Sequence, residues 1–437
     1  MTKVEQALQS ASETRALQIG VNILKRFPTI FKEQFQNKKA LIVADNTTYR
    51  VAGAAVSEIL HHVSIIQETP FIFVDKDLHA EYKYVEQLEN ALTQTDAIPV
   101  AVGSGTINDI TKLAAYHTGR QYFCVATAAS MDGYTANGAS IIFRNNKQTF
   151  ICPAPQAVLA DIEIIRYAPP EMTASGYADL FAKITAGADW ILSDALGVEA
   201  IEPTAWSIVQ DGLHDALAHP DGAHKGTVAA VTSLVEGLML GGFAMQHSRT
   251  SRPASGAEHQ FSHLWDMEHH THNGKIPAHG FKVGIATLYI SALYEQLLRH
   301  PVEKIDIEAC CAKWMEWEQQ EARVKEMFSD TDFLETALTE THAKYVTRTE
   351  LATQLKTLKT EWPIIKERLT RQLLPQNEVR HRLQLAGAPV ESEDIGINKS
   401  RLRDSFLRAQ HLRRRFTVLD LAVRTNCLDQ WLDQMFI

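Results

Sequence analysis

The stretch Ile98-Pro99-Val100-Ala101-Val102-Gly103-Ser104-Gly105-Thr106-Ile107-Asn108-Asp109 decides the fold. Its five leading apolar residues are typical of a short buried strand, and the glycine-rich turn after them opens a helical segment. The turn reads Gly-x-Gly-x-x-Asn and lacks the third glycine of the usual dinucleotide fingerprint. A simple strand-to-helix turn explains it nearly as well as a phosphate-binding loop. Its position directly after a strand favours phosphate binding.

Two further apolar runs precede this stretch, at 40–44 and 70–74. Residues 51–61 follow the first run and residues 82–93 follow the second, and both ranges have apolar positions at helical spacing. This alternation predicts a parallel sheet whose ligands bind at the carboxyl ends of the strands. Residues 1–37 also have helical spacing, and we expect a leading helix there.

Helical periodicity dominates after about Arg166. We therefore expect an α/β protein with two domains. Residues 1–168 form a Rossmann-like dinucleotide-binding domain with a parallel sheet. Residues 169–437 form an all-α metal- and substrate-binding domain with a C-terminal helical extension.

The composition excludes some partners. The chain has 437 residues and a net charge of −9, which argues against nucleic acid as a ligand. Its five cysteines form no Cys-x-x-Cys pair and indicate reduced thiols in the cytoplasm. The apolar stretch 226–245 approaches membrane-spanning length, but it contains Glu236 and lacks basic flanks. We interpret it as buried core and expect no membrane insertion.

A fourth apolar run, 122–126, ends in Thr127-Ala128-Ala129-Ser130-Met131-Asp132-Gly133-Tyr134. Hydroxyls and a carboxylate at the end of such a strand lie where cofactor and substrate would meet in an open α/β sheet. Ser, Asp and Gly also favour ordinary turns, so a capped turn explains the segment equally well.

A second group of polar residues suggests a metal site. In Ser251-Arg252-Pro253-Ala254-Ser255-Gly256-Ala257-Glu258-His259-Gln260-Phe261-Ser262-His263, two histidines lie four residues apart and project from one face of a helix. His279 enters from a separate element, and Asp179 lies in a largely apolar helical stretch. One carboxylate and two imidazoles with an open position suit Zn²⁺ or a similar metal. The competing interpretation of Asp179 is an ion pair with Lys183.

Two other clusters are weaker candidates. His269, His270 and His272 stand beside a turn signal and indicate an exposed loop. The basic run 411–415 is typical of a solvated or salt-bridged face, and anion binding is the less favoured alternative.

Five motifs together resemble a known family. They are Gly103–Asp109, Thr127–Tyr134, Asp179 with Lys183, Ser251–His263 and His279–Val283. In this order they resemble the sn-glycerol-1-phosphate dehydrogenases of the iron-containing alcohol dehydrogenase and dehydroquinate synthase-like superfamily. The resemblance covers roughly residues 38–300 and is closest to the longer bacterial members.

The resemblance implies roles for particular residues. Asp132 and His263 would contact substrate. The metal ligands would be Asp179, His259 and His279, with Asp179 also touching substrate. The dinucleotide would be held by Asp45, Gly103, Ser104, Gly105, Thr106 and Ile107, and its nicotinamide side would be lined by Thr127, Ala128, Ala129 and Ser130.

Two departures from related sequences matter. Ala136 stands where the family often has a serine, so a cofactor hydrogen bond is lost. Lys183 stands where iron-type alcohol dehydrogenases carry a histidine ligand, which favours Zn²⁺ or Ni²⁺ over Fe²⁺. The sequence leaves the choice between NAD and NADP open, although Asp45 at a strand end mildly disfavours a 2′-phosphate.

The implied activity is reversible, metal-dependent reduction of dihydroxyacetone phosphate to sn-glycerol 1-phosphate, in a homodimer. A dehydrogenase of unphosphorylated polyols, a sugar-phosphate cyclase and a non-enzymatic nucleotide-binding protein are the alternatives. The substrate phosphate needs a cationic partner, and the sequence does not choose among the candidates Arg249, Arg252, Lys275 and Lys282.

Overall fold

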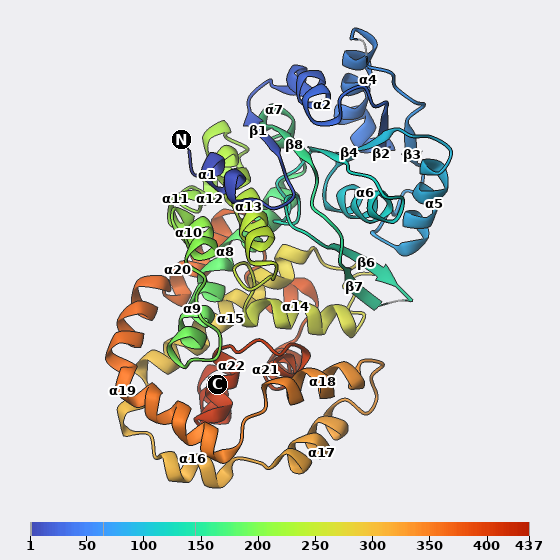
Figure 1. The fold of residues 1–437 in the computed structure, drawn as a ribbon. Helices are drawn as coiled ribbons and strands as arrows, with labels where there is room; N and C mark the ends of the chain where they lie inside the picture. Colours follow the sequence, from blue (N-terminus) through green and yellow to red (C-terminus); the bar gives the residue numbers. More distant parts are fainter. Residues whose placement is uncertain (1, 64, 145, 437) are drawn as a thin grey trace. The chain divides into compact units, whose positions relative to one another are not determined.

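The computed structural model describes residues 2–63, 65–144 and 146–436 (Figure 1). The chain forms two compact units. The first comprises Met1–Leu180, Ser207–Ser251 and Leu385–Gly387, and the second comprises Phe181–Trp206, Arg252–Gln384 and Ala388–Ile437. All the strands in the described part of the chain belong to the first unit. The predicted domain boundary at residue 168 stays a prediction.

The strands are β1 (Ala16–Gly20), β2 (Ala40–Asp45), β3 (Phe71–Phe73), β4 (Ile98–Gly103), β5 (Phe123–Ala126), β6 (Ala139–Phe143), β7 (Asn146–Phe150) and β8 (Ala157–Asp161). The helices up to residue 251 are α1 (Lys3–Ser10), α2 (Phe27–Phe35), α3 (Asn46–Thr48), α4 (Ala54–His61), α5 (Tyr82–Leu92), α6 (Gly105–His117), α7 (Ile162–Ile165), α8 (Pro170–Phe181), α9 (Lys183–Ala195), α10 (Pro203–Gln210), α11 (Leu213–Ala216), α12 (Pro220–His224) and α13 (Val228–Ser248). The later helices are α14 (Ala257–Met267), α15 (His279–Arg299), α16 (Ile307–Lys313), α17 (Trp317–Met327), α18 (Leu334–Lys344), α19 (Arg348–Gln372), α20 (Gln376–Leu385), α21 (Lys399–Arg408), α22 (Val418–Arg424) and α23 (Leu428–Met435).

The central sheet confirms the predicted α/β fold. Six parallel strands lie in the order β1-β8-β5-β4-β2-β3. Strand β4 is buried along its whole length, which is why its sequence is continuously apolar rather than alternating. Gly103 of β4 is the register partner of Ala126 of β5. The two segments that follow these strands therefore leave the same edge of the sheet side by side.

The predicted leading helix over residues 1–37 is wrong. The structure has α1, then strand β1, then α2. Strand β1 pairs in parallel with β8, with Ala16 opposite Ala157. Only Leu17 of this edge strand is buried, so its sequence carries no continuous apolar run. Its partner lies about 140 residues further along the chain, and local periodicity cannot predict a pairing between strands so far apart.

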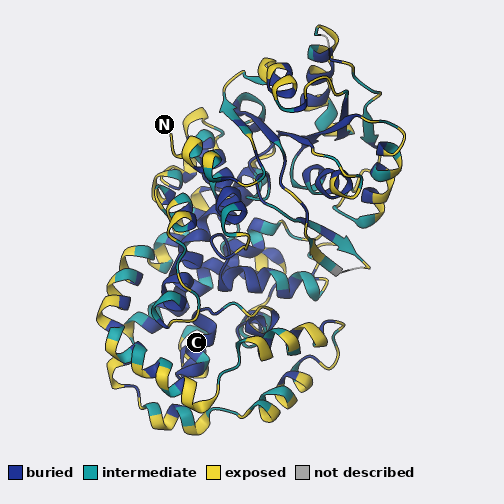
Figure 2. Cartoon of the chain, in the orientation of Figure 1, coloured by how far each residue is buried: buried dark blue, intermediate teal, exposed yellow. Residues whose placement is uncertain are grey.

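The apolar stretch predicted as buried core is helix α13. It is the one helix in the described residues that is long and apolar enough to cross a membrane, and 67% of its most apolar window is buried. It is mostly dark blue in Figure 2. The Oε1 atom of its Gln246 accepts hydrogen bonds from the backbone N–H groups of Glu13 and Thr14 at 3.1 and 3.3 Å. These contacts fit a helix packed inside a protein.

The second unit is built from helices around one apolar core, as predicted for the C-terminal part. Phe261 and Trp265 of α14 pack edge to face, with ring centroids 5.8 Å apart. The same core contains Tyr294 of α15, Trp362 of α19 and Trp431 of α23. The C-terminal extension therefore shares its core with the helices that carry His259 and His279.

Candidate metal centre and nucleotide turn

The turn after β4 is built for close approach of the backbone. A Cβ atom on Gly103 would lie 2.5 Å from Cβ of Ile107, so only glycine lets α6 begin here. The backbone N–H of Thr127 donates to the carbonyl oxygen of Gly103 at 3.1 Å. The Ser104 side chain does not cap α6, which leaves the first N–H groups of the helix for an anion.

Asp45 lies at the end of β2 and caps a helix. Its Oδ1 atom accepts hydrogen bonds from the backbone N–H groups of Thr47 and Thr48 at 2.7 and 2.8 Å. This cap fixes the carboxylate at the same edge of the sheet as the Gly103 turn. One oxygen is thus committed to the fold, and any contact with ribose falls to Oδ2.

The segment from Thr127 to Tyr134 packs tightly on α8. A Cβ atom on Gly176 would lie only 2.0 Å from the carbonyl oxygen of Ala129, and the Ser175 hydroxyl donates to the carbonyl oxygen of Ser130 at 3.2 Å. One turn further along α8, the carboxylate of Asp179 accepts the backbone N–H of Asp132 at 3.0 Å. The turn after β5 therefore holds the candidate substrate residue Asp132 against the candidate ligand Asp179.

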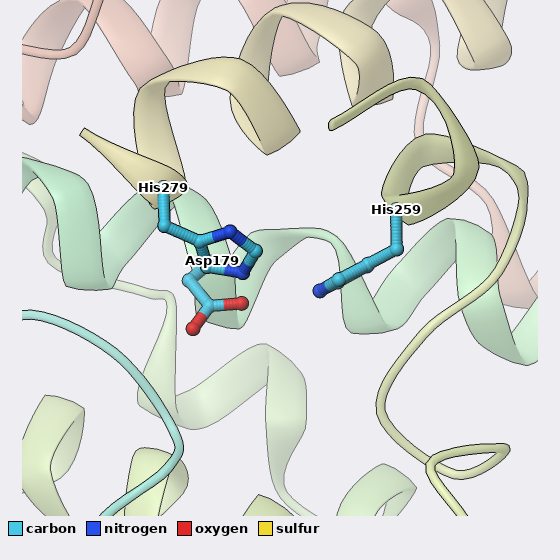
Figure 3. Close-up of side chains that lie close together, drawn as sticks. All are labelled: Asp179, His259 and His279. Atoms are coloured by element: carbon cyan, nitrogen blue, oxygen red, sulfur yellow. The ribbon is translucent and has the colours of Figure 1, made fainter. Parts of the chain in front are cut away.

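The three predicted metal ligands converge. The ligand atoms of Asp179, His259 and His279 all lie within 4.8 Å of one another, and Figure 3 shows their side chains facing one another. Asp179 is fully buried on α8, His259 is buried on α14, and His279 is the first residue of α15. The two imidazole centroids lie 5.4 Å apart.

Glu258 orients His259. Its Oε1 atom lies 2.8 Å from Nδ1 of His259, so this nitrogen carries the proton and Nε2 is left as the ligand atom. Glu258 also accepts a hydrogen bond from the Thr185 hydroxyl at 2.8 Å. A charged, hydrogen-bonded carboxylate behind a histidine is the usual support of a metal-binding imidazole.

Asp189 of α9 fixes the start of α14. Its Oδ2 atom accepts the backbone N–H of Ala257 at 2.7 Å, and its Oδ1 atom accepts the Tyr294 hydroxyl at 2.6 Å. A Cβ atom on Gly256 would lie 2.4 Å from this carboxylate, which explains the glycine. Burial, reinforced by the charge of Glu258, raises the pKa of Asp189 to about 7.

His263, one turn after His259 on α14, lies beside a C-terminal arginine. An Nη atom of Arg413 lies 3.4 Å from Nε2 of His263. Arginine only donates, so Nε2 accepts and Nδ1 carries the proton. Burial lowers the pKa of His263 well below its usual value, and the charge of Arg413 adds to this effect. His263 is therefore neutral at pH 7.

The weaker sequence candidates have structural roles. The predicted exposed loop is exposed at His269, but His270 is buried: its Nε2 donates to the carbonyl oxygen of Ile395 and its Nδ1 accepts from Arg401. The histidine next to an exposed turn is thus drawn into the core by a partner over a hundred residues away. Of the basic run, Arg414 forms the expected salt bridge, with Glu340 at 2.7 Å.

Sequence reasoning gave no role to Asp189 or Glu258, and it considered Arg413 only as part of the basic run 411–415. Asp189 carried a readable signal, because it is a carboxylate in a largely apolar helical stretch, as Asp179 is, whereas Glu258 stands among polar residues. The approach of Arg413 to α14 was not predictable, because the two are separated by 150 residues of sequence.

The donor set fits a divalent metal ion. One carboxylate oxygen and two imidazole nitrogens meet at a common point, with one imidazole already oriented by Glu258. Three protein ligands leave a coordination position for substrate, as in catalytic zinc sites. The predicted set Asp179, His259 and His279 is thus brought together.

Comparisons with known proteins agree with the sequence motifs. Residues 18–169 match the family model of iron-containing alcohol dehydrogenases. The glycerol-1-phosphate dehydrogenase (NAD(P)+) of Halalkalibacterium halodurans is 35% identical over 298 residues, which is 67% of this chain and 73% of the relative. The protein of the same name from Bacillus licheniformis is 32% identical and covers 74% of this chain and 84% of the relative.

Solved structures share the fold over nearly the whole chain. A probable glycerol dehydrogenase from Sinorhizobium meliloti superposes with a TM-score of 0.60 at 15% identity, covering 97% of both chains. Sulfoacetaldehyde reductase from Bifidobacterium kashiwanohense, in complex with NAD+, gives a TM-score of 0.58 at 13% identity, covering 95% of this chain and 97% of the reductase. With the sequence relatives, this confirms the resemblance found in the motifs: the chain belongs to the glycerol-1-phosphate dehydrogenase (NAD(P)+) family.

Proposed function

We propose that the protein is an oxidoreductase that interconverts dihydroxyacetone phosphate and sn-glycerol 1-phosphate, with NAD(H) or NADP(H) as hydride carrier. The observation that carries this proposal is the convergence of Asp179, His259 and His279, within 4.8 Å, in a chain of this family. A scaffold that only binds nucleotide has no use for three convergent ligands, one of them a histidine oriented by Glu258.

Asp179, His259 and His279 would hold a divalent metal ion, for which we propose Zn²⁺ or Ni²⁺. When bound, such an ion withdraws charge from a substrate carbonyl oxygen as a Lewis acid. Lys183 supports this choice over Fe²⁺, because iron-type relatives place a fourth, histidine ligand there. Glu258 keeps His259 in the tautomer in which Nε2 would be the ligand atom.

The cofactor would occupy the carboxyl edge of the sheet. The uncapped N–H groups that begin α6, from Gly105 to Ile107, suit the pyrophosphate, since a helix N-terminus attracts negative charge. Thr127 to Ser130 would line the nicotinamide, which supplies or accepts the hydride at its C4 atom. The packing of this segment on Gly176 limits how far it can move when the cofactor binds.

Asp132 and His263 are the proposed substrate contacts. The backbone of Asp132 is fixed by its hydrogen bond to Asp179, and its carboxylate would contact a substrate hydroxyl. His263 is neutral, so it offers one donor, Nδ1–H, rather than a positive charge. The proton of the product hydroxyl comes from solvent, relayed by one of these two side chains.

The direct test is turnover with a defined product. Purified protein loaded with Zn²⁺ or Ni²⁺ should oxidise NADH or NADPH when dihydroxyacetone phosphate is added. The product should be resistant to an sn-glycerol-3-phosphate-specific dehydrogenase, because it is the opposite enantiomer. Activity on dihydroxyacetone alone would instead identify a polyol dehydrogenase, and turnover of sugar phosphates without a net change in nicotinamide absorbance would identify a cyclase.

We further propose a homodimer in the cytoplasm. Free cysteines support the reducing compartment, since all five thiols are unbridged. Sedimentation analysis of the metal-loaded protein tests the oligomeric state.

A further inference from the structure

The substrate of the proposed reaction carries a phosphate dianion, which needs a cationic partner in the site. Two of the four cations that the sequence offered for this role, Arg252 and Lys282, already bind groups of the protein itself. Arg252 is fully buried and donates to the carbonyl oxygens of Phe416 at 3.0 Å and Asp189 at 2.8 Å. Lys282 is buried in an ion pair with Asp266. Both are structural cations.

A C-terminal segment runs along the helix that carries His259. Residues 413–417 form neither helix nor strand, and the segment is tied to positions in and near α14. The Arg415 guanidinium donates to the carbonyl oxygen of Ser255 at 2.7 Å, and Gln260 donates to the backbone carbonyl of Arg415 at 3.3 Å. The backbone N–H of Val418 donates to Asp189 at 2.8 Å. This segment therefore has a fixed register against α14.

The register places Arg413 opposite His263. Its guanidinium lies 3.4 Å from Nε2 of His263. His263 in turn lies one helical turn, or about 6 Å, along α14 from His259. Arg413 is exposed and has no carboxylate partner within 4.0 Å among the residues that the structure describes, unlike its neighbour Arg414, which pairs with Glu340. A guanidinium beside the ligand helix, open to solvent and without an ion-pair partner, is suited to bind an oxyanion in a bidentate manner.

We propose that Arg413 binds the phosphate group of the three-carbon substrate, with His263 as its neighbour on α14. This inference rests on the proposed function. It gives the C-terminal extension a role in the site, because it delivers the cation that selects phosphorylated over unphosphorylated substrate. The spacing of one helical turn between His259 and His263 is comparable to the length of a three-carbon chain, so substrate oxygens at one end and phosphate at the other have separate partners.

The test compares R413Q with the matched control R414Q, which removes a neighbouring guanidinium from a surface salt bridge. Removing charge-assisted hydrogen bonds to phosphate should lower the ratio of kcat/KM for dihydroxyacetone phosphate to that for dihydroxyacetone by about 10- to 100-fold, mainly through KM. Independently of turnover, binding of inorganic phosphate is measured by calorimetry with saturating NAD+, which blocks the pyrophosphate position. The affinity for phosphate should fall by a similar factor in R413Q and remain at the wild-type value in R414Q.

Each outcome decides a different statement. Equal phosphate affinity and equal KM in R413Q and R414Q would overturn the role of Arg413 while leaving the proposed function intact. Failure of the wild-type enzyme to reduce dihydroxyacetone phosphate would overturn the proposed function, and the calorimetric comparison would still decide whether Arg413 binds phosphate.

If R413Q does not fold, R413K replaces it. Lysine keeps the charge and loses the planar fork, so R413K should show a smaller loss of phosphate affinity, and wild-type affinity in R413K together with wild-type KM would contradict the proposal.

Discussion

The Oε1 atom of Glu258 lies 2.8 Å from Nδ1 of the next residue, His259. Adjacent side chains on a helix point in different directions, so this contact requires the start of α14 to be fixed. Asp189 and Gly256 provide that constraint, through the bond of Asp189 to Ala257 and the close approach that only glycine allows. The carboxylate–histidine pair is thus set by a buried acid on another helix.

Replacing Glu258 with Gln should weaken metal binding by about 10- to 100-fold, since an outer carboxylate raises the basicity of a ligating imidazole. Gln keeps an oxygen that can accept from Nδ1–H and removes the charge. Zn²⁺ titration against a competing chelator gives the affinity, and His259→Ala gives the baseline for a lost ligand. Affinity equal to wild type in Glu258→Gln, with unchanged melting of the metal-free protein, would show that the charge does not support His259.

Asp45→Asn separates two roles of one side chain. Asparagine is as good a helix cap as aspartate, so α3 should be retained, whereas Asp45→Ala should cost about 1 kcal/mol of stability. Loss of the negative charge removes repulsion of a 2′-phosphate worth about 1 kcal/mol, which corresponds to a rise of about fivefold in the NADPH-to-NADH ratio of kcat/KM. An unchanged ratio in Asp45→Asn would place the ribose away from this strand end.

Gly176→Ala should damage both stability and turnover. The new methyl group would be forced to within 2.0 Å of the Ala129 carbonyl oxygen, so α8 or the segment after β5 must shift. Overpacking of this kind costs about 1–3 kcal/mol. Urea unfolding and kcat are the measurements. Wild-type stability together with wild-type kcat would mean that the contact between α8 and the 127–134 segment does not position Asp132 and Asp179.

His411 should make the protein sensitive to acid. Burial beside Lys344 and Arg323 lowers its pKa from 6.5 to about 3. The unfolded chain therefore takes up a proton below pH 6.5 that the folded chain refuses until about pH 3, and stability is lost as the pH falls through this range by about 1.4 kcal/mol per unit.

The matched variant is His411→Asn. In the wild type, Nδ1 of His411 lies 2.9 Å from the Thr341 hydroxyl, and the asparagine amide keeps a polar group beside that hydroxyl. Between pH 7.5 and 5.0, with chelator present in both samples, the free energy of unfolding of wild type should fall by about 2 kcal/mol more than that of the variant. Identical pH dependence would show that His411 does not contribute.

The sequence was sufficient for the elements that repeat a local pattern. Strands β2, β4 and β5 were predicted because they are buried on both faces and read as continuous apolar runs. The convergence of Asp179, His259 and His279 was predicted from the family resemblance together with helical spacing, and not from spacing alone.

The features that depend on distant pairing were not predictable. Edge strand β1 is recognisable only through β8, and the burial of His270 only through Ile395. Likewise, Arg413 reaches His263 because the 413–418 segment is tied to Asp189 and Ser255, residues that local periodicity cannot connect to it. A basic run looks the same in sequence whether it faces solvent or a site.

The measurement that tests the central claim most directly is metal removal and restoration. The protein is stripped with a chelator, divided, reloaded with Zn²⁺ or Ni²⁺, and assayed with dihydroxyacetone phosphate and NADH, with His272→Ala as a control for a histidine outside the cluster. We predict that stripping abolishes turnover, that a stoichiometric metal ion restores it with sn-glycerol 1-phosphate as product, and that His279→Ala neither binds the ion nor turns over. Full turnover in the stripped protein, or in His279→Ala, would contradict the account.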